Sequence, residues 1–208
     1  MAATRVTAVA TVAAAGATER MNFLAHLWLA ERSGTSLPGA ILGDIVHGRD
    51  LSAYPEDVAA GIRLHRRIDV LTDSHPGIVA LRSDYPQGAR RYAGILLDLV
   101  CDHALALDWE RYAEEPLPDF CRRSAQAVAD AGEWFLRAGG QAPRAESFAQ
   151  LLLSYGEPQG IDRAIHRTAL RLRRPEPLIE AAVGWRGRLP LLRETLPSLL
   201  QDLRAAQA

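Results

Sequence analysis

Apolar residues recur at helical spacing through almost the whole sequence from about residue 22, and prolines and glycines divide this pattern into segments. Pro38, Pro55 and Pro76 each stand where a segment opens, which proline favours because its fixed backbone angle suits the first helical turn. Gly139 and Gly140 close another segment, as glycine often does after a helix. The strict polar–apolar alternation of a half-buried strand is absent from the sequence. The sequence therefore predicts an all-α protein.

The 208 residues lie within the size range of one domain, and we expect a single helical domain over residues 21–208. A chain of this length buries a substantial core without disulfides or structural metals, so a metal site here would be functional. The predicted helices span residues 22–32, 39–47, 55–74, 76–85, 88–112, 117–138, 144–155, 161–172 and 177–203. Pro190 and Pro197 are expected to kink or break the last of them.

Charge and cysteine content argue against several classes of protein. The formal net charge of −1 gives no sign of a nucleic-acid partner or of a polybasic membrane anchor. No apolar run reaches the roughly 18 residues that a membrane-spanning helix needs. Cys101 and Cys121 lie outside any CxxC pair, which disfavours a zinc–thiolate site and fits a reducing compartment. We therefore predict a cytoplasmic protein that binds neither nucleic acid nor membrane.

Residues 1–20 differ in composition from the rest of the chain. They consist mainly of Ala, Thr and Val, and their only charged residues are Arg5, Glu19 and Arg20. We expect a disordered tail, or a start codon placed upstream of a natural start at Met21. A weak signal peptide is the less favoured alternative, because a single arginine precedes its apolar stretch.

Two carboxylates interrupt the most apolar of the predicted helices. The stretch A-G-I-L-L-D-L-V-C-D-H-A-L-A covers residues 93–106, and a helix that is apolar all round is a buried helix. Asp98 and Asp102 lie one turn apart on the same face. Two buried carboxylates repel each other and lose their hydration, so we expect a cation between them. Either a divalent metal or an arginine would satisfy this requirement.

The same anomaly recurs in three earlier segments. His26 lies inside F-L-A-H-L-W-L-A, and Asp44 lies inside A-I-L-G-D-I-V. His65 and Asp69 share one helix face at a spacing that lets two side chains bind one ion. Taken singly, each has an alternative interpretation, such as a hydrogen-bonded core histidine or a capping aspartate. Taken together, they favour a shared polar centre in a helical bundle, which is a known architecture for metal sites.

At these residues the sequence resembles the acyl carrier protein phosphodiesterase family. The resemblance rests on four stretches: M-N-F-L-A-H-L-W-L-A at 21–30, G-A-I-L-G-D-I-V-H-G at 39–48, V-A-A-G-I-R-L-H-R-R-I-D-V-L-T-D at 58–73 and L-D-L-V-C-D-H at 97–103. The string H-R-R-I-D-x-x-T-D is long and specific. Beyond about Trp109 only a loosely similar helical pattern continues.

The resemblance implies a helical fold like that of the HD-type metal-dependent phosphohydrolases. It also implies manganese dependence and the removal of 4′-phosphopantetheine from the serine of holo-acyl carrier protein, which leaves the apo-protein. The contiguous His-Asp pair that names the wider superfamily is missing. His65 and Asp69 are separated, and Asp102 precedes His103, so the ligand set stays open.

We expect a metal-activated water to hydrolyse the phosphodiester. The expected metal ligands are Asp44, His65, Asp69, Asp98 and Asp102. His26 and His103 are the next candidates, as ligands or as acid–base groups. Arginines close to His65 are candidates for contacting the substrate phosphate or the acidic carrier protein, namely Arg63, Arg66 and Arg67.

Two other functions remain open from the sequence. One is a helical metal-dependent phosphohydrolase that acts on a nucleotide or another small phosphodiester. The other is a non-catalytic helical protein that only binds a carrier protein. Metal content would separate the binding protein from both enzymes, and a panel of substrates would separate the two enzymes.

Overall fold

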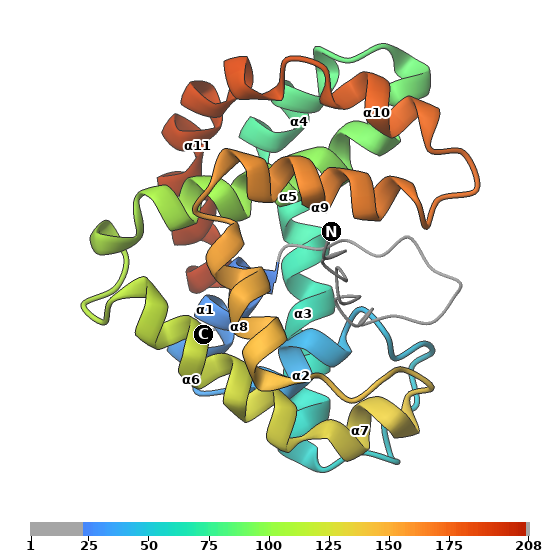
Figure 1. Ribbon diagram of the computed structural model, residues 1–208, viewed down its shortest axis with the longest axis vertical. Helices are drawn as coiled ribbons and strands as arrows, with labels where there is room; N and C mark the ends of the chain where they lie inside the picture. Colours follow the sequence, from blue (N-terminus) through green and yellow to red (C-terminus); the bar gives the residue numbers. More distant parts are fainter. Residues whose placement is uncertain (1–22, 207–208) are drawn as a thin grey trace, which may run out of the picture.

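The computed structural model describes residues 23–206, and all regular structure within this range is helical (Figure 1). The all-α prediction is therefore confirmed, whereas the prediction of a tail over residues 1–20 lies outside the described residues. The helices are α1 (Phe23–Arg32), α2 (Leu37–Leu42), α3 (Glu56–Ser74), α4 (Pro76–Ser83), α5 (Arg90–Leu107), α6 (Leu117–Asp130), α7 (Gly132–Arg137), α8 (Ala145–Ser154), α9 (Pro158–Ala169), α10 (Glu176–Ala182) and α11 (Trp185–Ala205), with short 3-10 turns η1 (Gln87–Ala89) and η2 (Trp109–Arg111).

Helix α5 is the centre of the packing. Its residues are buried without interruption from Ile95 to Ala106, as its all-round apolar sequence predicts. Helices α1, α4, α9, α10 and α11 all pack against it. In Figure 1, α9 and α10 lie in the upper half of the view, and α1, α2, α6, α7 and α8 lie in the lower half. None of the described helices is both long and apolar enough to span a bilayer.

Two glycines let α2 cross α3 at close range. A methyl group on Gly39 would stand 2.4 Å from the carbonyl oxygen of Val58, and one on Gly61 would stand 2.7 Å from the carbonyl oxygen of Ser36. These are backbone atoms, which cannot rotate away as a flexible side chain can. The absence of side chains at these positions therefore sets the distance between α2 and α3.

The buried carboxylate of Asp102 holds the beginning of α1. Its two oxygens each accept a backbone N–H at 2.9 Å, one from Leu24 and one from Ala25. The first amides of a helix have no partner within the helix, and the helix dipole favours a negative charge beside them. Asp102 thus serves as a cap donated by another helix, and it fixes the position of the first turn of α1.

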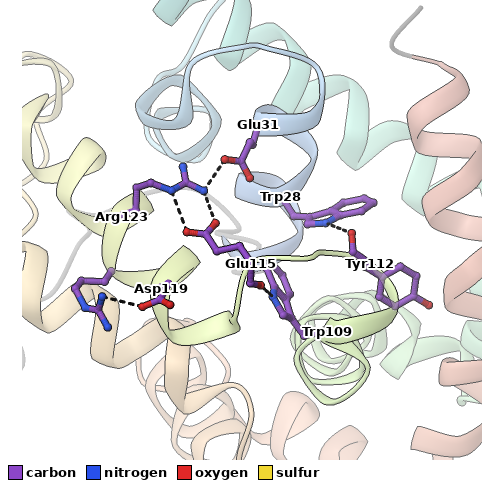
Figure 2. A network of polar contacts seen from close by, with 8 residues as sticks. Trp28, Glu31, Trp109, Tyr112, Glu115, Asp119 and Arg123 are labelled. Carbon is purple, nitrogen blue, oxygen red and sulfur yellow. Dashed lines mark hydrogen bonds and ion pairs between the residues drawn. The ribbon is translucent and has the colours of Figure 1, made fainter.

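A polar network fixes the other half of α1 (Figure 2). The indole nitrogen of Trp28 donates to the carbonyl oxygen of Tyr112 at 3.3 Å. Arg123 on α6 pairs with Glu31 on α1 and with Glu115, both at 2.6 Å. Exposed ion pairs contribute little singly, but here one guanidinium joins two separate segments. Helix α1 is therefore held at both ends.

Helix boundaries differ from the sequence prediction at several places, and three of these differences bear on the site and the packing. The segment predicted over 39–47 ends at Leu42, so Asp44 lies in a turn. The segment predicted over 117–138 divides into α6 and α7. The last segment breaks at Gly184, whose φ of 73° is readily adopted by glycine, and α11 continues through Pro190 and Pro197. Both prolines are exposed, so α11 loses backbone hydrogen bonds only where water can replace them.

We predict that Gly39→Ala lowers the free energy of unfolding by about 1–3 kcal/mol, because the new methyl group would force α2 away from α3. The matched control is Gly187→Ala on α11, where a methyl group meets nothing within 4 Å. Urea denaturation of both variants checks this. Equal midpoints for Gly39→Ala and the unmodified chain would contradict the close crossing.

Candidate metal centre

Two helices and a turn bring two imidazoles and two carboxylates together. His26 comes from α1, His65 and Asp69 come from α3, and Asp44 comes from the turn that follows α2. Ligand atoms of His26, His65 and Asp69 all lie within 4.8 Å of one another. Both histidines are buried, whereas the side chains of Asp44 and Asp69 are 10% and 23% exposed. The carboxylates therefore form the side of the group that solvent reaches.

The nitrogen–oxygen distances within this group match those between neighbouring ligand atoms of one metal ion. The Nε2 atom of His26 lies 3.2 Å from an oxygen of Asp69, and Nε2 of His65 lies 3.4 Å from the other oxygen. Asp44 Oδ1 is 3.3 Å from the same nitrogen of His65. Metal–ligand bonds of about 2.1 Å separate neighbouring ligand atoms by roughly 3.0–3.4 Å. The group can therefore hold a metal ion with little movement.

Hydrogen bonding aims His65 into the group. Its Nδ1 atom lies 2.6 Å from the carbonyl oxygen of Ala40 on α2. A carbonyl only accepts hydrogen bonds, so Nδ1 carries the hydrogen and Nε2 is the nitrogen left to face the carboxylates. Gly43 makes room for the ring, because a methyl group there would stand 2.2 Å from its Cγ atom.

The ring nitrogens of His26 give the strongest support for a metal site. Both of its ring nitrogens are buried, and neither makes a hydrogen bond of normal geometry to any described residue. Burial and the neighbouring His65 lower the pKa of His26, although Asp69 and Asp44 oppose this. The ring also stacks on His65, with centroids 4.0 Å apart. A neutral imidazole with unused nitrogens is the form that binds a metal, and buried polar atoms rarely stay without partners.

Without a metal, His65 takes the positive charge that the carboxylates require. Burial opposes the charged form of His65, but Asp44 and Asp69 outweigh it and raise its pKa from 6.5 to about 10. Burial likewise opposes charge on Asp69, but the two histidines outweigh it and lower the pKa of Asp69. The stabilisation from protonated His65 is complete below pH 6.5 and is lost as the pH rises towards 10.

Three predicted site residues on α5 lie outside this group of ligand atoms. Asp102 binds the amides of α1. Its pKa is raised to about 8 by burial, against the effect of those two hydrogen bonds. His103 places Nδ1 2.6 Å from the carbonyl oxygen of Tyr155 and its ring against the edge of Trp185. Asp98 is buried on the same helix. The structure thus brings His26, rather than Asp98 or Asp102, together with the ligands on α3.

The arginines near His65 mostly make contacts within the protein. Arg63 pairs with Glu56 at the surface. Arg66 donates to the carbonyl oxygens of Val46 and Gly48, at 2.6 and 2.7 Å, and so fixes the segment that follows Asp44. Arg67 is exposed. One turn beyond Asp69, Asp73 pairs with Arg82 at 2.9 Å.

A cavity of about 860 Å³ lies on another part of the surface. Its walls include Trp28, Tyr112 and Leu200, with guanidinium groups from Arg32, Arg111 and Arg204. None of its lining residues belongs to the imidazole–carboxylate group. Solvent therefore reaches the group at its partly exposed carboxylates, Asp44 and Asp69, and not through this cavity.

Sequence reasoning missed the residues that aim the ligands. Gly43 and the carbonyl of Ala40 determine where the His65 ring lies, and a backbone carbonyl leaves no trace in a sequence. Gly43, by contrast, is recognisable in the sequence, because it directly precedes Asp44 inside an apolar segment. Glycine in such a place often marks a close approach of two parts of the chain.

Fold and site together define a helical protein whose buried imidazole–carboxylate centre can hold a metal ion. The family model described as acyl carrier protein phosphodiesterase matches residues 21–202. The chain therefore belongs to the acyl carrier protein phosphodiesterase family. The match contains every residue of the centre, so the family resemblance seen in the sequence is confirmed.

Curated relatives agree with this assignment. An acyl carrier protein phosphodiesterase from Enterobacter sp. (strain 638) is 46% identical over 110 residues, which cover 52% of this chain and 57% of the relative. One from Photorhabdus laumondii is 48% identical over 109 residues, covering 52% of this chain and 55% of the relative. The chain thus spans about half the length of the curated relatives it matches. No solved structure matches it significantly, so the HD-type fold stays a prediction.

We predict that Gly43→Ala weakens the binding of Mn²⁺ or Zn²⁺ by about 10–100-fold, the usual cost of disturbing what orients a ligand. The new methyl group would displace the His65 ring, whereas the helical backbone angles of Gly43 suit alanine. Gly94→Ala is the control, because a methyl group there comes no closer than 3.8 Å to another residue. Calorimetric titration of both variants checks this. Unchanged affinity in Gly43→Ala would show that His65 does not bind the ion.

We also predict that metal affinity rises with pH. A metal must displace the proton of His65, whose pKa is about 10, so affinity should increase about tenfold per pH unit between pH 6.5 and 8. Titrations in buffers with different ionisation heats would count the released protons, with about one expected per ion. The control is His65→Gln, which should lose both the binding and the pH dependence. A flat pH profile in the unmodified chain would refute the assignment.

Proposed function

We propose that the chain hydrolyses the phosphodiester that joins 4′-phosphopantetheine to a serine of holo-acyl carrier protein. Water would add to phosphorus, the bond from phosphorus to the serine oxygen would break, and that oxygen would take a proton. The products are apo-acyl carrier protein and 4′-phosphopantetheine. The observation that carries this proposal is the family match over residues 21–202, which includes the whole imidazole–carboxylate group.

His26, His65 and Asp69 are the residues that would hold the metal, which we propose to be Mn²⁺. Imidazole and carboxylate ligands suit this ion, although they suit Zn²⁺ and Fe²⁺ as well. A bound divalent ion would stabilise negative charge on the phosphoryl oxygens and favour the reactive form of water. The buried rings of the two histidines would supply two of the ligands, and Asp69, whose side chain is partly exposed, would supply the third on the side that solvent reaches.

Asp44 is the residue best placed to orient the water that would attack phosphorus. Its carboxylate is partly exposed and lies 3.3 Å from Nε2 of His65. We assign it to orienting the water and accepting its proton, or to completing the metal ligands once His65 is neutral. Asp102 and His103 act at a distance instead, because they position the beginning of α1 and the end of α8.

The proposal predicts that holo-acyl carrier protein loses the mass of one phosphopantetheine group when incubated with the purified full chain and Mn²⁺. Excess chelator should stop the reaction. Asp69→Asn and Asp44→Ala should each slow it by at least about a hundredfold, because they remove a ligand or the residue that orients water. Mass spectrometry of the carrier protein measures each rate.

Asp73→Asn is the matched control, since Asp73 lies one turn along α3 from Asp69 and pairs with Arg82. It should retain most of the activity. Full activity in excess chelator would refute the metal mechanism. Hydrolysis of small phosphodiesters without hydrolysis of the carrier protein would instead favour the alternative of a phosphohydrolase with a small substrate.

A further inference from the structure

The cavity of about 860 Å³ lies between the end of α1, the turn η2 and the second half of α11. Sites for small molecules typically enclose about 300–1,000 Å³, so this cavity has the size of a ligand site. No residue of the imidazole–carboxylate group lines it. The proposed hydrolysis therefore does not account for it.

One face of α11 forms a wall of the cavity. Pro197, Leu200, Gln201 and Arg204 follow one another at spacings of three and four residues, which places them on the same side of the helix. Leu200 is buried, whereas Arg204 is exposed in the last turn of α11. This wall therefore combines an apolar surface with a cation.

Contacts within the protein hold a second cation, Arg32, in place at the end of α1. Its guanidinium lies over the ring of Trp28, 4.6 Å from the ring centroid, and its Nη2 atom donates to the carbonyl oxygen of Tyr112. The indole nitrogen of Trp28 donates to the same oxygen (Figure 2). A guanidinium has five N–H donors, so Arg32 keeps donors for a ligand. Because its side chain is already ordered, a ligand would bind it at a smaller cost in conformational entropy.

The charges around the cavity favour an anion. Of the described residues that line it, three are arginines and none is an aspartate or glutamate. The third arginine, Arg111 in η2, lies 3.9 Å from Asp108. Both oxygens of Asp108 accept hydrogen bonds from Arg193, one of them at 2.9 Å, so Asp108 compensates Arg111 only weakly. Like charges gathered around one hollow repel one another, and an anion bound between them would offset that repulsion.

We propose that this cavity is a second binding site, which takes a small organic molecule that carries a phosphate group. Guanidinium groups match the paired oxygens of phosphate and carboxylate alike. Three arginines without an acid in the walls favour a doubly charged phosphate over a singly charged carboxylate. The apolar wall at Leu200 would contact the organic part of the ligand. The site binds and performs no chemistry.

The shape of the site favours a small molecule over an acidic protein. The three arginines come from α1, η2 and α11, and they line one hollow rather than a single helix face. A stable protein partner instead covers about 800 Å² of surface on each side. A concave site of this volume encloses most of a small ligand.

The test is calorimetric titration of the full chain with phenyl phosphate, in excess chelator and at constant ionic strength. Inorganic phosphate lacks the organic part and benzoate lacks the second charge, so we expect each to bind at least about fivefold more weakly than phenyl phosphate. Equal binding of inorganic phosphate and phenyl phosphate would refute the organic ligand. Because no metal and no turnover are involved, failure of the hydrolysis experiment would leave this result unaffected.

Arg111→Gln and Arg204→Gln locate the binding in the cavity. Both side chains are exposed, so the variants should keep the melting temperature, and each should weaken the binding of phenyl phosphate at least about fivefold. Arg174→Gln is the matched control, because it removes the same charge from an exposed position that does not line the cavity. It should bind within about twofold of the unmodified chain.

Two results would overturn the proposal. One is failure of phenyl phosphate to bind saturably, or equal binding by all three variants. The other is that Arg111→Gln and Arg204→Gln weaken the binding of holo-acyl carrier protein while phenyl phosphate does not bind, which would assign this surface to an acidic protein instead.

Discussion

The contact between the Asp102 carboxylate and the first amides of α1 determines where the centre can form. A carboxylate in an apolar helix loses its hydration, and that loss is acceptable only where hydrogen bonds replace the water. Two amides at a helix beginning supply these bonds at 2.9 Å, together with a favourable dipole. His26 directly follows Leu24 and Ala25 in α1. The hydrogen bonds that fix these two amides therefore also fix where the His26 ring lies. The neighbouring His103 fixes the end of α8 in the same way, through the carbonyl of Tyr155.

Helical periodicity predicted the fold class and most helices, because burial of an apolar face has a direct signature in the sequence. The α3 boundaries follow from Glu56 and Asp57 in its first turn and Pro76 after its end. The pairing of His65 with Asp69 was predictable too, since both lie on one face of that helix. The role of Asp102 was not, because its partners are backbone amides of another helix. A metal, an arginine and a helix beginning all satisfy a buried carboxylate, and a sequence does not distinguish them.

Charge balance explains why the centre needs two imidazoles as well as two carboxylates. Two carboxylates beside one protonated His65 leave one negative charge uncompensated next to His26. Replacement of that proton by a divalent cation would balance both carboxylates and use Nε2 of His65 together with a ring nitrogen of His26. Release of a proton on metal binding follows from this arrangement.

Several residues shape the site although they carry no side chain that could bind a metal or substrate. Gly39 and Gly61 let the backbones of α2 and α3 meet, and Gly43 leaves space for the His65 ring. Arg66, which the spacing suggested for the substrate, instead holds the carbonyls that follow Asp44. Proximity in sequence to a metal ligand is thus a weak guide to a substrate contact, because a guanidinium close to the ligands can equally hold the backbone carbonyls of the site's own frame.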